Sequence, residues 1–577
     1  MKLLWKVLKR YKALAAVTLT ALLVDVAGTL YVPTMLAGMI NQGVALGSAD
    51  FVVGQGLKML LACCCASGGA LLGNYLCARL SARVGRDIRN AVYDASLGFS
   101  GADFEEFGTG SMITRTLNDV NVIQQTVMLA TQTMLPVPII CIMGAVMALR
   151  IDVQMGAMML AVVAVVMALA VVAVRRAAPI FKKMQGFIDR MNVVLRENIV
   201  GVRVVRAFNK EPREEERMGD VFSDYAGAAI KVNWIFAGVD CFSFCLMNIA
   251  EVALIWLGGN RVGAHAMQIG DISACVEYAM LIMFYIMMAQ FVALMVPRAL
   301  VCLKRCADVI EKVPSIRDVS GPVQLRHSPA VRADEVARFD SVSFRFADAD
   351  EDTLHGIGFT CRRGQTTAII GSTGSGKSTI AKLLLRLHDV TDGALLFEGT
   401  DVRNMTQHAL RERVSYVPQK AWLFSGTIES NLRYGNDDAT REDLEHALAV
   451  AQAAFVNDLS DGLGASVSQG GTNFSGGQRQ RLSIARALVK KADLYIFDDS
   501  FSALDFKTDA ALRRALAEEM QDSAVLIIAQ RVSTILHADQ IVVLKEGCIA
   551  GVGTHEELME RCEVYQEIAR SQMKGGE

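Results

Sequence analysis

The sequence predicts an all-α transmembrane domain of six helices fused to an α/β P-loop nucleotide-binding domain. Hydrophobic residues make up 52% of the chain and crowd its first 300 positions, and a GxxxxGK[ST] motif follows in the second half. A chain of 577 residues is too long for a single hydrophobic core. We expect the transmembrane domain over residues 1–310, a linker over 311–335 and the nucleotide-binding domain over 336–577.

Six apolar stretches are each long enough for the roughly 20 residues that a membrane-spanning helix needs. They are Ala13–Leu36, Val52–Leu76, Met128–Leu149, Val153–Val174, Trp234–Leu257 and Ile272–Val296. Long polar stretches separate the second span from the third and the fourth from the fifth. Both have helical character, so we expect them to extend the spans beyond the bilayer.

Basic residues gather on one side of the predicted spans. They are Lys2, Lys6, Lys9, Arg10, Lys12, Arg79, Arg83, Arg86, Arg89, Arg175, Arg176, Lys182, Lys183, Arg298, Lys304 and Arg305. The opposite side has little more than Arg150 and Arg261. The positive-inside rule then places both termini, both long connections and the nucleotide-binding domain in the cytoplasm of a multi-pass protein of the plasma or inner membrane. The six spans and the lack of a basic stripe argue against a nucleic-acid partner.

Four acidic residues fall within the predicted spans: Asp25, Asp240, Glu251 and Glu277. Charge inside a membrane is costly and is often functional, so each is a candidate for substrate contact. The alternative is that an open aqueous cavity hydrates them. The 13 cysteines lack the spacing and histidine partners of a metal site, so we interpret most of them as small packing residues.

The phosphate-binding motif follows a strand-like run, Thr366–Ile370, and opens a helix. Its residues are Gly371, Ser372, Thr373, Gly374, Ser375, Gly376, Lys377, Ser378 and Thr379. Backbone N–H groups of such a loop face a polyphosphate, the lysine reaches its outer phosphates, and the Ser378 hydroxyl binds Mg²⁺. Downstream, Leu494–Asp498 is predicted to be a buried strand whose terminal carboxylate, Asp498, holds Mg²⁺.

A second anion-binding cradle is predicted where another helix begins. It consists of Ser475, Gly476, Gly477 and Gln478, followed by a helix over Leu482–Leu488. Two cradles far apart in one domain indicate that two copies of the domain sandwich the nucleotide between them.

With these residues identified, the whole chain resembles a half-transporter of the ATP-binding cassette exporters. Phe474–Gln478 resembles the family signature. The resemblance implies that Gln419 senses Mg²⁺, that Phe346 stacks on adenine, and that Ser502–Asp505 is the D-loop, with Asp505 near nucleotide. Phe107–Ser111, Arg115, Asn118–Val120, Val204–Phe208 and Glu211 resemble the two cytosolic coupling loops.

Two positions depart from the family pattern. Asp499 stands where active members have the catalytic glutamate, and Gln530 stands where they have a histidine. Aspartate is one methylene shorter, and Gln cannot carry the charge of a protonated imidazole. Gln469, before the signature, also stands where many exporters have glutamate.

The resemblance therefore implies the degenerate-site subunit of a heterodimeric exporter. Such a chain binds ATP and Mg²⁺, pairs with a second half-transporter that carries Glu and His, and exports a hydrophobic drug, lipid or peptide across the bilayer. Three alternatives stay open: neutral drift in an ordinary homodimer, a homodimeric lipid or peptide exporter with slow chemistry at both sites, and an ATP-gated regulatory or channel-like protein.

Overall fold

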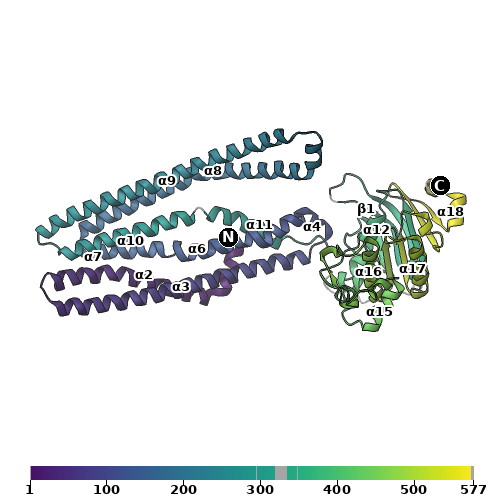
Figure 1. Ribbon diagram of the computed structural model, residues 1–577, viewed down its shortest axis with the longest axis horizontal. Coiled ribbons are helices and arrows are strands. Elements are labelled where there is room, and N and C mark those ends of the chain that lie inside the picture. Colours follow the sequence, from purple (N-terminus) through teal and green to yellow (C-terminus); the bar gives the residue numbers. More distant parts are fainter. Residues whose placement is uncertain (1, 294, 319–333, 347, 574–577) are drawn as a thin grey trace. The chain divides into compact units, whose positions relative to one another are not determined.

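The computed structural model describes residues 2–293, 295–318, 334–346 and 348–573. The chain divides into two compact units (Figure 1). The first consists of Met1–Gly98 and Phe107–Val313, and the second of Phe99–Glu106 and Pro314–Glu577. Most of the predicted linker, residues 319–333, lies outside the described residues.

The first unit is built from long helices. Among the described residues, six helices are long and apolar enough to cross a membrane, which confirms the predicted six spans. The predicted helical extensions are also confirmed, since α3, α8 and α9 have 49, 55 and 53 residues. The α-helices are α1 (Lys2–Leu8), α2 (Lys12–Gly38), α3 (Ala49–Leu97), α5 (Thr109–Thr114), α6 (Val120–Leu129), α7 (Pro136–Ile151), α8 (Val153–Ala207), α9 (Glu211–Gly263), α10 (Ile269–Ala293) and α11 (Val296–Glu311). Short π-helical or 3₁₀ turns, η1 (Lys9–Tyr11), η2 (Met39–Val44), η3 (Arg115–Asp119) and η4 (Ala130–Met134), interrupt them.

Consecutive helices of this unit pair as hairpins, α2 with α3 and α8 with α9, and run side by side for most of their length (Figure 1). Small residues permit close approach: a Cβ on Gly28 of α2 would lie 2.8 Å from the Cβ of Ala66 on α3. Small residues at crossings are typical of helices that pack in lipid, where close van der Waals contact drives association. Near the opposite end from the long extensions, Asp152 caps α8 and accepts hydrogen bonds from the Arg261 guanidinium of α9.

In the part of the second unit that the structure describes, there are two larger sheets and a small hairpin. A mostly parallel six-stranded sheet has the order β12-β11-β3-β10-β9-β6, and an antiparallel sheet has the order β2-β1-β4-β5. The strands are β1 (Glu335–Phe344), β2 (Leu354–Arg362), β3 (Thr366–Gly371), β4 (Asp392–Phe397), β5 (Thr400–Asp401), β6 (Val414–Val417), β7 (Gly426–Thr427), β8 (Ser466–Val467), β9 (Leu494–Asp498), β10 (Ala524–Ile528), β11 (Gln540–Lys545) and β12 (Cys548–Gly553). Its α-helices are α12 (Lys377–Leu384), α13 (Gln407–Arg413), α14 (Ile428–Arg433), α15 (Arg441–Val450), α16 (Gly476–Val489), α17 (Phe506–Glu519), α18 (His555–Arg561) and α19 (Glu563–Met573).

The strand register brings four separate segments to one edge of the six-stranded sheet. Strands β3, β10, β9 and β6 are neighbours and run parallel, with Ile528 opposite both Ile369 and Asp498, and Val417 opposite Phe497. Every residue of β9 and β10 is buried, as apolar strands covered on both faces require. Residues that follow these strands therefore meet at the carboxyl edge, where ligands bind in open α/β sheets.

A short segment from between α3 and α5 folds with the second unit. This segment contains α4 (Gly101–Phe107). Asp103, in the first turn of α4, is only 3% exposed. The Oδ2 atom of Asp103 accepts hydrogen bonds from the backbone N–H and hydroxyl of Ser100, at 3.1 and 2.9 Å, and from those of Ser315, at 3.0 and 3.1 Å. Burial disfavours the charged form, but the hydrogen bonds from Ser315 and Ser100 outweigh it and hold the pKa of Asp103 below its ordinary value.

We predict that Asp103→Ala loosens residues 99–106. Four donors then lose their acceptor, which costs about 2 kcal/mol of local opening free energy, and hydrogen exchange of these amides should accelerate. Because the pKa of Asp103 is lowered on folding, its contribution is complete above the ordinary carboxyl pKa and is lost as the pH falls through the lowered value. Asp94→Ala, at an exposed acid of α3, is the control and should leave the exchange unchanged.

Candidate functional site

The phosphate-binding loop connects β3 to α12, so the predicted strand, loop and helix are confirmed. Gly374 and Gly376 have φ values of +84° and +93°, which side chains rarely adopt. A Cβ on Gly376 would lie 2.5 Å from Cδ2 of Leu354, and one on Gly371 would lie 2.3 Å from the carbonyl oxygen of Leu544. The glycines of the motif are therefore required by backbone conformation and by crowding.

Lys377 begins α12 and folds back over the loop. Its Nζ donates to the carbonyl oxygens of Gly371, at 2.9 Å, and Ser372, at 2.6 Å. Burial lowers the pKa of Lys377, and the charges of Asp499 and Asp498 oppose this shift. Within the described residues the buried Ser375 hydroxyl has no hydrogen-bond partner. A cationic group, an unpartnered hydroxyl and a helix N-terminus together fit a polyphosphate.

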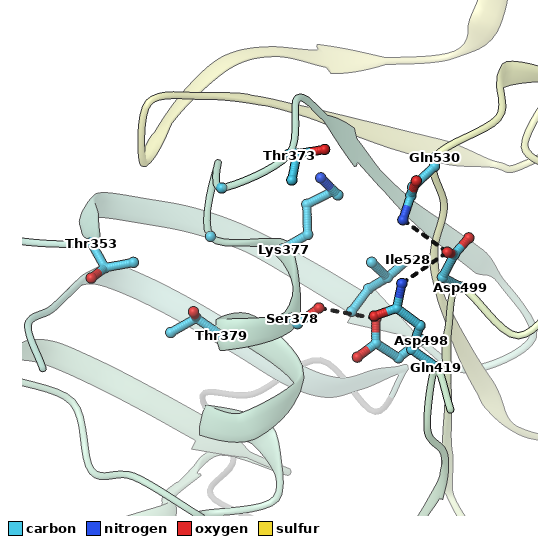
Figure 2. A pocket seen from close by; sticks show the side chains of 12 residues that line it. Thr353, Thr373, Lys377, Ser378, Thr379, Gln419, Asp498, Asp499, Ile528 and Gln530 are labelled. Carbon is cyan, nitrogen blue, oxygen red and sulfur yellow. Dashed lines mark hydrogen bonds between the residues drawn. The ribbon is translucent and has the colours of Figure 1, made fainter. Parts of the chain in front are cut away.

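A pocket of about 360 Å³ opens beside the loop (Figure 2). It is lined by Thr353, Thr373, Gly374, Gly376, Lys377, Ser378, Thr379, Gln419, Asp498, Asp499, Ile528 and Gln530. Ten of these twelve are predicted site residues; Thr353 and Ile528 are not. Thr353 precedes β2 in a segment without a motif, so the sequence does not mark it as a site residue. In the structure its carbonyl oxygen lies close to Gly376. Ile528 is the last residue of a buried apolar strand. In the sequence it cannot be distinguished from the other apolar residues of the core.

Asp498 ends β9 and is 4% exposed. Its Oδ1 accepts a hydrogen bond from the Ser378 hydroxyl at 3.2 Å, and its Oδ2 accepts one from the Tyr416 hydroxyl at 3.3 Å (Figure 2 shows the first). Burial raises the pKa of Asp498, and the hydrogen bonds from Ser378 and Tyr416 oppose the shift. Carboxylate and hydroxyl oxygens are ligands that suit Mg²⁺, so these residues fit the predicted cation. Tyr416 is not a predicted site residue, although it lies three positions before Gln419, which is one.

Asp499 receives two side-chain amides on one oxygen (Figure 2). The Nε2 atoms of Gln530 and Gln419 donate to its Oδ2 at 2.8 and 3.1 Å. The amide of Gln530 thus points at the carboxylate. Asp499 has a φ of +46°, in the left-handed region, and its backbone N–H donates to the Ile528 carbonyl at 2.8 Å. Such conformations persist where the surroundings over-determine them, often at functional sites.

Opposing influences set the ionisation of Asp499. Burial raises its pKa, whereas the hydrogen bond from Gln419 and the charges of Arg531 and Lys377 favour the carboxylate. The net direction is upward. A carboxylate with a raised pKa beside a polyphosphate site can accept a proton from an attacking water.

Several predicted residues are not among the twelve that line this pocket. Phe346 packs its edge against the His388 ring, with centroids 5.4 Å apart, and the Lys382 ammonium lies over it. Ser475 and Gln478 form a capping box that begins α16, and Asp505 caps α17 by accepting a hydrogen bond from the Thr508 N–H at 3.0 Å. Contact of these residues with nucleotide stays a prediction.

The acidic residues within the spans are placed in different surroundings. Asp25 and Glu251 are half-buried, whereas Asp240 and Glu277 are exposed in the isolated chain. Asp25 accepts a long hydrogen bond, 3.5 Å, from the Thr29 hydroxyl one turn away on α2. A role in substrate contact stays a prediction for all four.

Comparison with known proteins places both parts of the chain. Residues 14–287 match the family model described as ABC transporter transmembrane region, and residues 354–502 match the one described as ABC transporter. An uncharacterized ABC transporter ATP-binding protein of Mycobacterium tuberculosis is 37% identical over 98% of this chain and 97% of its own length. A multidrug efflux ATP-binding/permease protein of the same species is 31% identical over 86% of this chain and 41% of its own length.

A solved structure of similar fold is that of a bacterial Atm1-family ABC exporter with ATP bound. It has a TM-score of 0.82 and 25% sequence identity, and the match covers 97% of this chain and 98% of that one. The predicted fold class, six transmembrane helices followed by an α/β nucleotide-binding domain, is thereby confirmed.

We predict that Arg531→Ala shifts the pH dependence of ATP hydrolysis at this pocket. Loss of the positive charge makes the Asp499 carboxylate less favourable, so its pKa rises further and the acid side of the pH–rate profile moves to higher pH. Lys377, whose charge also favours the Asp499 carboxylate, is left unchanged. Arg531→Lys keeps the charge and should keep the profile. An unshifted profile in Arg531→Ala would show that ionisation of Asp499 does not limit turnover.

Proposed function

Because the chain belongs to the ABC transporter family, as a half-transporter of the exporter type, we propose that it exports hydrophobic or amphipathic compounds with a slow ATP site of its own. In this proposal it pairs with a second, catalytically complete half-transporter in the cell membrane. Its termini and nucleotide-binding domain face the cytoplasm, on the side where the basic residues gather. The multidrug efflux relative supports this type of substrate.

The arrangement at Asp499 carries the proposal of a slow site. Both amides, from Gln419 and Gln530, donate to the one carboxylate oxygen, Oδ2. These bonds occupy the oxygen that would accept a water proton, and the one from Gln419 stabilises the charged form against the upward pKa shift that burial causes. Gln530 also lacks the ionisable ring that a histidine would bring to the γ-phosphate.

The binding residues nevertheless remain complete. Lys377 and the loop backbone would bind the phosphates, and Ser378 and Asp498 would hold Mg²⁺. Bound ATP supplies the phosphoryl group whose transfer to water releases the energy for transport. The chain's residues orient the phosphates and limit the access of the attacking water, and Asp499 takes its proton slowly.

The signature supports a different role for the other face of this domain. Ser475 and Gln478 fix the first turn of α16, with the Ser475 hydroxyl accepting from the Gln478 N–H at 3.2 Å and the Gln478 side chain accepting from the Ser475 N–H at 2.9 Å. An ordered helix N-terminus binds anions well. We infer that it completes the active site formed with the partner's phosphate loop.

The decisive experiment is to purify the tagged chain from its native host in mild detergent and identify accompanying proteins by mass spectrometry. A stoichiometric second half-transporter with Glu and His at the two catalytic positions supports the heterodimer. Recovery of the chain alone, as a dimer, contradicts it and favours the homodimeric exporter. ATP-dependent accumulation of a hydrophobic dye in inside-out vesicles tests export itself, and its absence would favour an ATP-gated regulatory protein.

We predict unequal effects of two substitutions on the ATPase activity of the purified complex. Gly477→Asp places a negative charge in the signature and should remove most of the activity, since losing one anion-stabilising contact costs on the order of 10²-fold. Asp499→Asn should remove only a small part. Comparable losses in the two variants would mean that this chain's own pocket carries the main turnover.

A further inference from the structure

The C-terminal helix α19 contacts the loop that carries Gln530. Tyr565 and Ala569 of this helix are buried, at 0% and 1% exposure, and the Tyr565 hydroxyl lies 2.8 Å from Nδ1 of His555. Residues 565, 569 and 572 are spaced by four and three, so they share one helix face. Gln572 continues this face; it is exposed, but it lies beside η9 (Val532–Thr534).

Gln572 makes two hydrogen bonds to the backbone of this loop. Its Nε2 donates to the Gln530 carbonyl at 2.7 Å, and its Oε1 accepts from the Val532 N–H at 2.8 Å. A primary amide carries a donor and an acceptor side by side, so one side chain satisfies both backbone groups. The residue between the two bonded positions is Arg531.

The first residue thus held, Gln530, contacts Asp499: its Nε2 donates to the carboxylate at 2.8 Å. The far end of the same loop is anchored from α17, because the Arg513 guanidinium donates to the carbonyl oxygens of Ser533 and Thr534 at 3.0 and 3.2 Å. The end that faces the pocket is held by Gln572.

We propose that Gln572 is a positioning residue that fixes Gln530 against Asp499 and so sets the rate of ATP hydrolysis at this chain's pocket. This inference goes beyond the proposed export function. It assigns α19 a role in positioning a residue of the ATP site. This role would be the same in a homodimer and in a heterodimer.

The test uses Gln572→Leu in the purified full-length transporter, since leucine is similar in size and makes neither hydrogen bond. Gln566→Leu is the matched control: Gln566 lies on the same helix, and its amide donates to the Met559 carbonyl at 2.9 Å, away from the loop. The activity of this chain's pocket is measured as the part of ATP turnover that Lys377→Ala removes. Thermal unfolding verifies that each variant is folded.

We expect Gln572→Leu to lower the kcat of this part of the activity about fivefold, the equivalent of one hydrogen bond of about 1 kcal/mol, with the KM for ATP unchanged. Gln566→Leu should match the unsubstituted transporter. Hydrogen exchange of the Val532 amide should accelerate in Gln572→Leu only. In a Gln530→Ala background Gln572→Leu should have no further effect on kcat, because both act through the same contact.

Three results would each overturn the proposal. Unchanged exchange at Val532 would mean that the contact does not form in solution. Faster exchange with unchanged kcat would mean that the contact forms but positions nothing. An equal loss of kcat with and without Gln530 would mean that Gln572 supports the domain in general rather than this side chain.

Discussion

The hydrogen-bonded register of four parallel strands determines the candidate site. Strands β3, β10, β9 and β6 end together; Asp498 is the last residue of β9, and the phosphate loop, Gln530 and Gln419 follow the ends of the other three. Because side chains alternate along a strand, a slip of one residue in β9 would turn Asp498 to the opposite face of the sheet. Complete burial of β9 and β10 prevents this, since the surrounding apolar residues fit only one register.

The features that sequence predicts well are those whose cause is local. The six spans follow from apolar length, and the phosphate loop follows from glycines whose positive φ and crowding admit no side chain. The meeting of two amides at Asp499 could not be predicted, because Gln419 and Gln530 lie 80 and 31 residues away along the chain. The same applies to residues 99–106, which fold with the second unit through hydrogen bonds to Ser315. Such contacts depend on strand order and on loop paths, which leave no periodic pattern.

The two anion-binding features of the nucleotide-binding domain differ in how their polar groups are used. At Asp499 the neutral amides are directed at the residue that would accept the proton, and a left-handed backbone holds it there. At the start of α16 the side chains of Ser475 and Gln478 bond to each other's backbone N–H groups and fix the first turn of the helix. A helix N-terminus ordered in this way can bind an anion from outside the chain. This contrast is the physical basis for assigning slow chemistry to one and phosphate recognition in the partner's site to the other.

Asp499, Gln419 and Gln530 form a set whose side chains constrain one another's substitution. A glutamate at 499 would move the carboxylate by about 1.5 Å, the length of one carbon–carbon bond, toward the two amides that now donate to it. Such a substitution therefore loses existing hydrogen bonds unless Gln419 and Gln530 change with it, so the three positions behave as a coupled unit rather than as independent sites.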